Sequence, residues 1–448
     1  MSDRASAHLN RLTDLVGRAR KAGADAADAV LFEGASLSLS YRLGKPEDVE
    51  RSENRDLGLR VLIGKRQAFV STTDFAAPAL DELLTRAVAM AKATPEDPYC
   101  GIADPSEIAK SWPDLDLQDP TEVSAETLVA RAREAEEAAL AVKGVTNSEG
   151  AGADWSTGLV VLAASNGFAG SYGGSRHGVS ASVIAGEGTL MERDYDYAST
   201  RFLADLGSAA AVGKKAGEQA VARLNPRKMS SRQVPVVFAP RVAGGLVGSM
   251  LGAITGPAVA RGTSFLKDKL GQQIFAAGIR VVDDPHKPRG LRSKPFDGEG
   301  LPTRRTVIIE DGRLTTWLLD GASARQLGLK STGHAARGTG GPPSPSSTNV
   351  YLEAGKLSPD ELIADIKDGF YITELIGMGV NGVTGDYSRG AAGFWIENGK
   401  ITYPVSELTV ASNLKDMYRA MTPASDLTFK YGTDAPTIRV EGMMVAGS

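Results

Sequence analysis

The segment from Glu374 to Pro404, ELIGMGVNGVTGDYSRGAAGFWIENGKITYP, constrains the fold of this chain most, because it is dense in glycine. Glycine adopts positive φ angles and tolerates the close approach of other atoms, so the pattern predicts tightly shaped loops that line a surface. The dipeptide Asn398-Gly399 near the end of the segment is typical of a hairpin turn. We therefore expect shaped loops followed by a β-hairpin.

Part of this segment, Gly377 to Gly382, fits the dinucleotide-binding pattern G-x-G-x-x-G. In that pattern the last glycine opens a helix whose N-terminal amides hold a pyrophosphate. Here further glycines follow, together with Thr384 and Asp386, so the sequence does not predict a helix at this point. We interpret the match as coincidental and do not expect nucleotide binding.

Composition narrows the class of protein. A chain of 448 residues predicts two or three domains, and a formal charge of -4 gives no broad basic field for nucleic acid. Cys100 is the only cysteine, which excludes an internal disulfide, a thiolate-rich zinc site and an iron-sulfur cluster. We find no signal peptide and no apolar run of about eighteen residues. A cytoplasmic protein with neither a nucleic-acid nor a membrane partner is expected.

Hydrophobic spacing predicts an α+β fold with an N-terminal domain over residues 1–225, built from antiparallel sheets with flanking helices. The order helix, four strands, helix is expected twice, which suggests an internal duplication. The expected strands are 29–32, 37–41, 57–63 and 68–72, then 145–148, 158–164, 169–175 and 179–186.

Residues 226–448 are expected to form a second, β-rich and barrel-like domain with short helices between its strands. The main expected strands are 234–238, 307–310, 314–319, 349–352, 372–376, 393–405, 407–410 and 437–445. The expected helices are 239–251, 322–327, 360–367 and 413–419.

The run GMGVNGVTGDYSRG over 377–390, with Gly393-Phe394-Trp395 just after it, closely resembles the glycine-rich segment of the TldD/PmbA family. The resemblance is to the PmbA (TldE) branch, extends over nearly the whole chain, and is most specific over 246–284, 319–352 and 373–416. It implies one subunit of a heteromeric, TldD/TldE-type zinc metalloprotease that processes peptide precursors and degrades small unfolded proteins.

Members of the TldD branch resemble metalloproteases in carrying H-E-x-x-x-H on a helix ahead of an R-G-T-S segment. Two imidazoles on such a helix bind zinc, and the glutamate takes a proton from the metal-bound water. Here the segment 261–264 reads RGTS, but Val247, Gly248 and Gly252 stand at the positions of the first histidine, the glutamate and the second histidine. The resemblance therefore implies no catalytic or metal-binding residue in this chain, and a TldD-like partner that holds the zinc.

What remains is a surface suited to binding. An extended peptide could pair with an exposed strand edge through main-chain hydrogen bonds. An equally open alternative is that the glycine-rich segments only close the second domain. The candidates for a peptide channel or a subunit contact are Ser344, Asn349, Asn381, Asp386, Tyr387, Ser388 and Arg389.

Two other classes of function stay open: a stand-alone hydrolase with a site drawn from His177, His334 or Cys100, and a regulatory peptide-binding protein without peptidase activity. His286 lies near three aspartates, but we expect a solvated loop over 283–300 rather than a metal site. A homodimer of the isolated chain is also plausible, because a large partner-facing surface left unpaired tends to self-associate.

Overall fold

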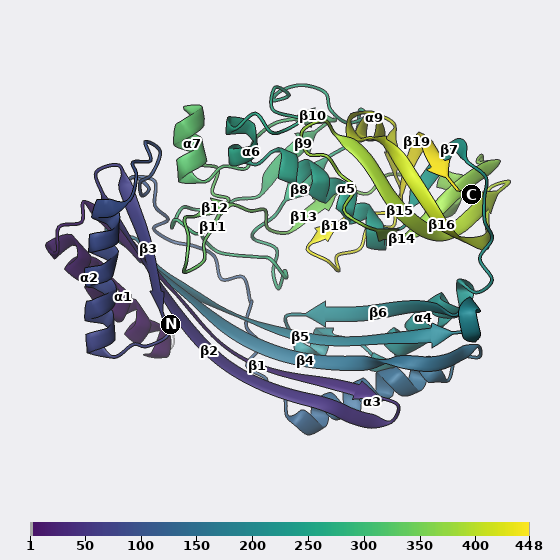
Figure 1. The fold of residues 1–448 in the computed structure, drawn as a ribbon, viewed down its shortest axis with the longest axis horizontal. Coiled ribbons are helices and arrows are strands. Elements are labelled where there is room, and N and C mark those ends of the chain that lie inside the picture. The colour runs from purple at the N-terminus through teal and green to yellow at the C-terminus, as the bar shows by residue number, and fades with distance from the viewer. Residues whose placement is uncertain (1–2, 448) are drawn as a thin grey trace.

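The computed structural model describes residues 3–447, and its first part is a six-stranded antiparallel sheet with long, curved strands (Figure 1). The strand order is β3-β2-β1-β4-β5-β6, so β1 and β4 form the central pair. The helices are α1 (Asp3–Lys21), α2 (Ala77–Ala93), α3 (Ala125–Leu140) and α4 (Ala209–Ala222). The strands are β1 (Ala26–Arg42), β2 (Lys45–Ile63), β3 (Arg66–Thr72), β4 (Val145–Ala164), β5 (Ala169–Ala185) and β6 (Glu192–Thr200).

Each half of this part has the order helix, three strands, helix, so the expectation of four strands was wrong. The segments 29–32 and 37–41 belong to the single strand β1, because the weak strand formers Gly34 to Ser36 stay paired with β2 and β4. The four segments expected over 145–186 likewise form only β4 and β5. The strand β6 was missed because its sequence, ERDYDYAST, is mostly polar.

The two helix pairs cover different stretches of one face of the sheet. Leucines of α1 and α2 pack against β1 and β2. The cluster includes Leu12 of α1, Leu31 of β1 and Leu57 of β2. The helices α3 and α4 approach more closely, since a Cβ added at Gly213 would lie 1.8 Å from the carbonyl oxygen of Ala135. Small residues therefore set the distance between α3 and α4.

The second part contains a closed five-stranded barrel of β7, β14, β15, β16 and β19, closed because β16 pairs with both β15 and β19. The predicted α+β class and the barrel-like C-terminal part are confirmed. The barrel elements are β7 (Arg232–Phe238), β14 (Asp368–Ile376), β15 (Asp386–Glu397), β16 (Lys400–Asn413) and β19 (Ile438–Ala446), with β17 (Met421–Pro423) paired to β19.

A smaller five-stranded sheet and several short helices lie beside the barrel. The sheet contains β8 (Val281–Asp283), β9 (Thr306–Glu310), β10 (Arg313–Leu314), β13 (Val350–Leu352) and β18 (Thr433–Asp434), and β11 (Ala335–Ala336) pairs with β12 (Ser344–Pro345). The helices are α5 (Pro240–Ala253), α6 (Gly256–Ala260), α7 (Gly321–Leu327), α8 (Pro359–Ile363) and α9 (Leu414–Arg419).

The strand expected over 314–319 was wrong, because β10 ends at Leu314. The following residues hold the junction between α5 and α6 instead. The Leu318 N–H donates to the Ile254 carbonyl, and the Leu318 carbonyl accepts from Gly256. The hydrophobic residues that had suggested a strand therefore form hydrogen bonds to the junction between α5 and α6.

A buried charge cluster joins the two parts. Asp28 of β1 forms ion pairs with Arg60 of β2 and with Arg337 of the second part, and all three side chains are at most 4% exposed. Burial raises the pKa of Asp28, but the guanidinium groups of Arg337 and Arg60 outweigh burial and hold this pKa below its usual value. Asp28 is therefore charged at neutral pH.

Two further buried carboxyl groups lie close to this cluster. Burial raises the pKa of Asp297 to about 6, although backbone N–H groups of Leu301, Glu299 and Ala335 oppose the rise. Burial, and then the charge of Asp297, raises the pKa of Glu299 to about 7. The folded chain thus keeps a proton on Glu299 to a higher pH than the unfolded chain does.

Glu299→Gln is therefore expected to change how stability depends on pH. Between the ordinary glutamate pKa of 4.5 and about 7, only the folded wild type retains this proton, so its free energy of unfolding falls as pH rises. The variant has no such loss and should gain roughly 3 kcal/mol on the wild type between pH 4.5 and pH 8. Urea unfolding across this range measures the gain, with the exposed Glu96→Gln as control; a pH-independent difference would contradict the assignment.

Within residues 3–447, no helix combines the length and the apolar character needed to cross a bilayer.

Candidate functional site

The helix α5 contains Val247, Gly248 and Gly252 and has two different faces. Proline at its first turn and the extended backbone of Ala239 start the helix. Leu246, Val247 and Met250 face the barrel core. The opposite face carries Gly245, Gly248 and Gly252, which are exposed, and a Cβ added at any of them would meet nothing within 4 Å. Val247 thus points away from the face that Gly248 and Gly252 share.

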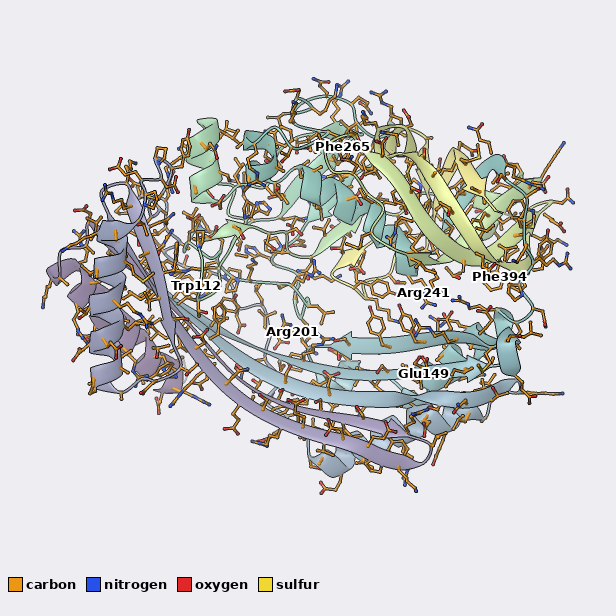
Figure 2. The ribbon with its side chains drawn as sticks, in the orientation of Figure 1. Trp112, Glu149, Arg201, Arg241, Phe265 and Phe394 are labelled. Carbon is orange, nitrogen blue, oxygen red and sulfur yellow. The ribbon has the colours of Figure 1, made fainter. Side chains whose placement is uncertain are left out.

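Gly245 of this exposed face lines a cavity of about 330 Å³ between the two parts of the molecule, which we call the cleft. Gly248 and Gly252 are not part of its lining. One wall comes from β5, β6 and α4, and the other comes from α5, β14 and β15. Arg241 lies between β6 and the second part of the chain (Figure 2). Charged residues dominate the lining, which includes Asp194, Arg223, Arg241, Gly245, Glu374 and Arg389.

Ion pairs fix the walls of the cleft to each other. Asp194 of β6 is 4% exposed and accepts from Arg241 Nη1 at 2.8 Å. Arg223, the residue that follows α4, contacts Asp194 at 3.4 Å and Glu374 of β14 at 2.5 Å. The guanidinium of Arg241 also lies over the ring of Tyr195, 4.6 Å from its centroid. The cleft therefore has a charged and aromatic wall held in place from both sides.

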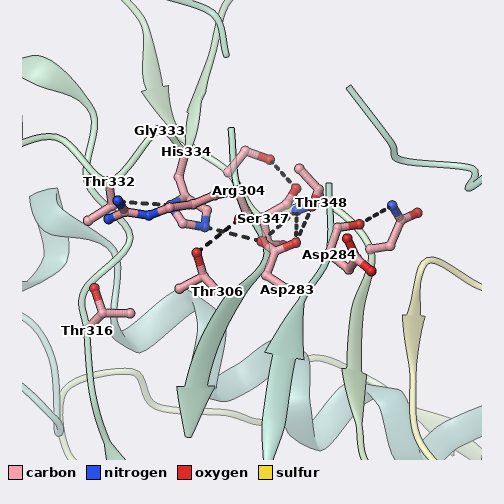
Figure 3. A network of polar contacts seen from close by, with 12 residues as sticks. Asp283, Asp284, Arg304, Thr306, Thr316, Thr332, Gly333, His334, Ser347 and Thr348 are labelled. Carbon is pink, nitrogen blue, oxygen red and sulfur yellow. Dashed lines mark hydrogen bonds and ion pairs between the residues drawn. The ribbon is translucent and has the colours of Figure 1, made fainter. Parts of the chain in front are cut away.

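A second polar network surrounds His334 (Figure 3). Its Nδ1 lies 2.9 Å from the Thr332 hydroxyl and its Nε2 lies 3.4 Å from an Asp283 carboxylate oxygen. This order of hydroxyl, imidazole and carboxylate resembles a nucleophile with its base. However, the Thr332 hydroxyl also accepts from the Leu319 N–H at 2.8 Å, and His334 is only 4% exposed. The network holds loops of the second part together and does not reach the cleft.

Comparison with known proteins gives consistent matches along the chain. Three consecutive domains of the PmbA/TldA metallopeptidases match: domain 1 at residues 27–91, the central domain at 118–224 and the C-terminal domain at 231–447. Metalloprotease PmbA of Escherichia coli O157:H7 is 42% identical over 94% of this chain and 92% of its own. The chain belongs to the PmbA/TldD family.

The matches place it on the PmbA branch of that family. The metalloprotease PmbA homolog of Haemophilus influenzae is 38% identical over 96% of this chain and 94% of its own, whereas the TldD homolog of the same organism is 29% identical over 55% of this chain and 54% of its own. A Bacteroides thetaiotaomicron protein described as a putative modulator of DNA gyrase has the same fold, with a TM-score of 0.90, 26% identity and 98% coverage of both chains.

The residues of α5 do not fit the metal ion that the family name implies. Val247, Gly248 and Gly252 have no side-chain nitrogen, oxygen or sulfur atom, and Val247 lies in the core. Across residues 3–447, no group of three or more histidine, cysteine, aspartate or glutamate residues is placed to hold a metal ion. No metal-dependent step can therefore be assigned to this helix.

Of the seven candidates for a peptide channel or a subunit contact, Arg389 lies in the cleft lining. Asn381 and Asp386 shape their own loop: the Asn381 side chain accepts from Val383 and Thr384, and Asp386 accepts from Thr384 at 2.6 Å. Ser388 is exposed, and its N–H donates to Gly379 in the same loop.

The other three candidates have different surroundings. Tyr387 is 3% exposed and lies in the barrel core, while Ser344 is exposed on β12. Asn349 is buried, and its amide binds the Asp284 carbonyl and the Ser293 hydroxyl, both at 2.7 Å. These contacts give Asn349 a structural role.

The residues named for a stand-alone hydrolase do not meet in one site. His177 is fully buried 3.2 Å from Asp119, and burial lowers its pKa despite that carboxylate. Burial, and then the charge of Asp97, raises the pKa of the Cys100 thiol, so Cys100 is a poor nucleophile. Neither residue lines the cleft.

The expectation of a solvated loop around His286 was wrong. Phe296 and Asp297 are 2% and 1% exposed, because Phe296 packs against Trp112 and Phe168 of the first part. His286 itself lies 2.9 Å from the Thr303 hydroxyl. An aromatic cluster between the two parts therefore buries a loop whose charges had suggested exposure.

Sequence reasoning missed the cleft residues contributed by the first part, Asp194, Tyr195 and Arg223. The alternation of charged and aromatic residues in ERDYDY was the available signal for a strand facing a polar site. A larger hollow of about 740 Å³ lies between the helix pairs, beside Trp155 and Arg55, and includes none of the predicted site residues.

Proposed function

We propose that this chain is the zinc-less subunit of a two-chain peptidase. One observation carries the proposal: α5 has the family position and an open glycine face, but no donor atom at the three motif positions. A TldD-like chain would supply the zinc, its ligands and the general base. The curated relatives include both PmbA and TldD homologs of Haemophilus influenzae and of Buchnera aphidicola, which is consistent with such a pair.

In this proposal the chain contributes part of an enclosed chamber and holds an extended peptide in it. The cleft combines ionic groups with the exposed ring of Tyr195 and with exposed backbone at Gly245, which suits peptides of varied sequence. We infer that the natural substrates are peptide precursors and small unfolded proteins of the cytoplasm. The isolated chain could also form a homodimer through the surface that the partner would cover.

Measurements of zinc content and of peptide cleavage test whether the partner, and not this chain, holds the zinc and performs the hydrolysis. The purified chain is expected to carry no stoichiometric zinc and to leave an unstructured peptide intact, because it has no metal-binding helix. Addition of the TldD-like protein from the same organism should produce cleavage that a chelator abolishes. Mass spectrometry of the peptide and elemental analysis of the protein measure both outcomes.

Each alternative gives a different result in the same experiment. Cleavage by the lone chain that His334→Ala removes would favour the stand-alone hydrolase. Peptide binding without cleavage in either the lone chain or the mixture would favour the regulatory protein. Tightly bound zinc in the lone chain would contradict our proposal directly.

A further inference from the structure

Arg389 of β15 differs from the other arginines of the cleft, because the described chain offers it no carboxylate. Within residues 3–447 its guanidinium donates a long hydrogen bond, from Nη2 to the Leu375 carbonyl at 3.4 Å, and lies beside the Tyr387 hydroxyl. Every other cleft arginine lies within ion-pair distance of a carboxylate: Arg193 of Glu149, Arg223 of Glu192, Asp194 and Glu374, and Arg241 of Asp194. Arg389 is thus the cation of the cleft that no acidic group within residues 3–447 neutralises.

The surroundings of Arg389 do not compensate its charge. The Nε atom of Arg389 is buried and makes no hydrogen bond of good geometry. The nearby Tyr387 hydroxyl is also buried and makes no such hydrogen bond. Burial raises the pKa of Tyr387 to about 12 although Arg389 lowers it, so this hydroxyl stays neutral at neutral pH. A partly buried, unpaired cation is unfavourable, and an anion that enters the cleft would relieve this cost.

Two neighbouring features also favour an anion at this wall. The hydroxyl of Thr373 on β14 lines the cleft and is buried without a hydrogen-bond partner. The first turn of α5 reaches the same cavity through Arg241 and Val242. Its N-terminus has no side-chain cap, and the N–H groups of Ala239 and Val242 donate to the backbone carbonyls of Ile372 and Ala239. The positive end of a helix dipole attracts negative charge. Gly245 leaves the space beside this turn open.

We propose that Arg389, the Thr373 hydroxyl and the first turn of α5 form a binding site for a carboxylate group of an extended peptide. A guanidinium binds a carboxylate through parallel N–H···O hydrogen bonds, which fixes its orientation as well as its charge. The carboxylate is either the C-terminal group or an acidic side chain. This inference rests on the proposed function, since it identifies the part of a peptide that this chain holds.

Binding of defined peptides to the lone chain tests the site without any peptidase partner. We would compare by fluorescence anisotropy three versions of one fluorescein-labelled, unstructured decapeptide: a free C-terminal acid, its amide, and the amide with one glutamate at the last position. The free acid is expected to bind at least about tenfold more tightly than the plain amide. If the glutamate amide matches the free acid, the site takes side-chain carboxylates; if it matches the plain amide, the site reads the chain terminus.

Arg389→Gln should abolish the preference for the acid and leave the affinity for the amide unchanged. Arg389→Lys should keep only part of the preference, because a lysine lacks the planar fork. Arg133→Gln, on the exposed face of α3, is the matched control, and thermal melting verifies that each variant is folded. Equal binding of acid and amide, an equal loss of both in Arg389→Gln, or no binding of any peptide would overturn the proposal. The lone chain could instead bind the acid selectively while its mixture with the TldD-like protein cleaves no peptide. That result would refute the proposed function alone and leave the carboxylate site standing.

Discussion

Gly245→Phe is expected to reduce peptide cleavage by the mixed TldD-like and PmbA-like proteins on the order of 100-fold, the loss that a misplaced substrate can cause. The benzyl group would enter the cleft, since nothing lies within 4 Å of a Cβ added at this exposed position. Folding should be unaffected or slightly favoured, because phenylalanine has a better helix propensity than glycine. Initial rates of peptide cleavage, with thermal melting of the isolated chain, measure the two effects separately.

Gly17→Phe provides the matched control. Gly17 is also an exposed glycine within a helix, α1, and a Cβ added there also meets nothing within 4 Å. The control variant should show a similar change in stability with unchanged cleavage. Full activity of Gly245→Phe in the mixture would show that peptide does not pass through the cleft.

Asp28→Asn is expected to destabilise the protein by about 3–5 kcal/mol, the usual cost of removing one partner from a buried ion pair. The substitution would leave the guanidinium groups of Arg60 and Arg337 in a site where both are nearly inaccessible to water. Because Arg337 belongs to the second part of the chain, the junction between the two parts should loosen first. Chemical denaturation measures the loss, followed by tryptophan fluorescence, to which Trp112 at that junction contributes together with the three other tryptophans.

Two further variants separate this effect from a general loss of charge. Asp14→Asn removes an exposed carboxylate that pairs with Arg18 in α1, and it should change stability little. Adding Arg337→Met to Asp28→Asn should recover part of the lost stability, because one of the two unpaired cations is then gone. If Asp28→Asn unfolds at the denaturant concentration of the wild type, the cluster does not hold the two parts together.

Local sequence patterns determined most of the secondary structure and the absence of donor atoms at the positions that the resemblance assigns to metal binding. Hydrophobic spacing predicted helices that flank the first sheet, as α1 and α2 do, and the run after Arg232 predicted β7 followed by α5. The identities of Val247, Gly248 and Gly252 are facts of the sequence, so the missing ligands needed no structure to be seen. These features depend on neighbours along the chain, which the sequence records directly.

Tertiary structure alone decided which residues share the cleft. Asp194, Arg223 and Glu374 lie far apart in the sequence, and the docking of the first sheet against the barrel brings them together. The same docking buries Phe296 and Asp297, whose loop is rich in charge, and leaves Arg389 without a carboxylate partner within residues 3–447. Burial and ion pairing depend on which surfaces meet in space. Periodicity along the chain does not encode that information, so it predicted the elements of this protein but not its site.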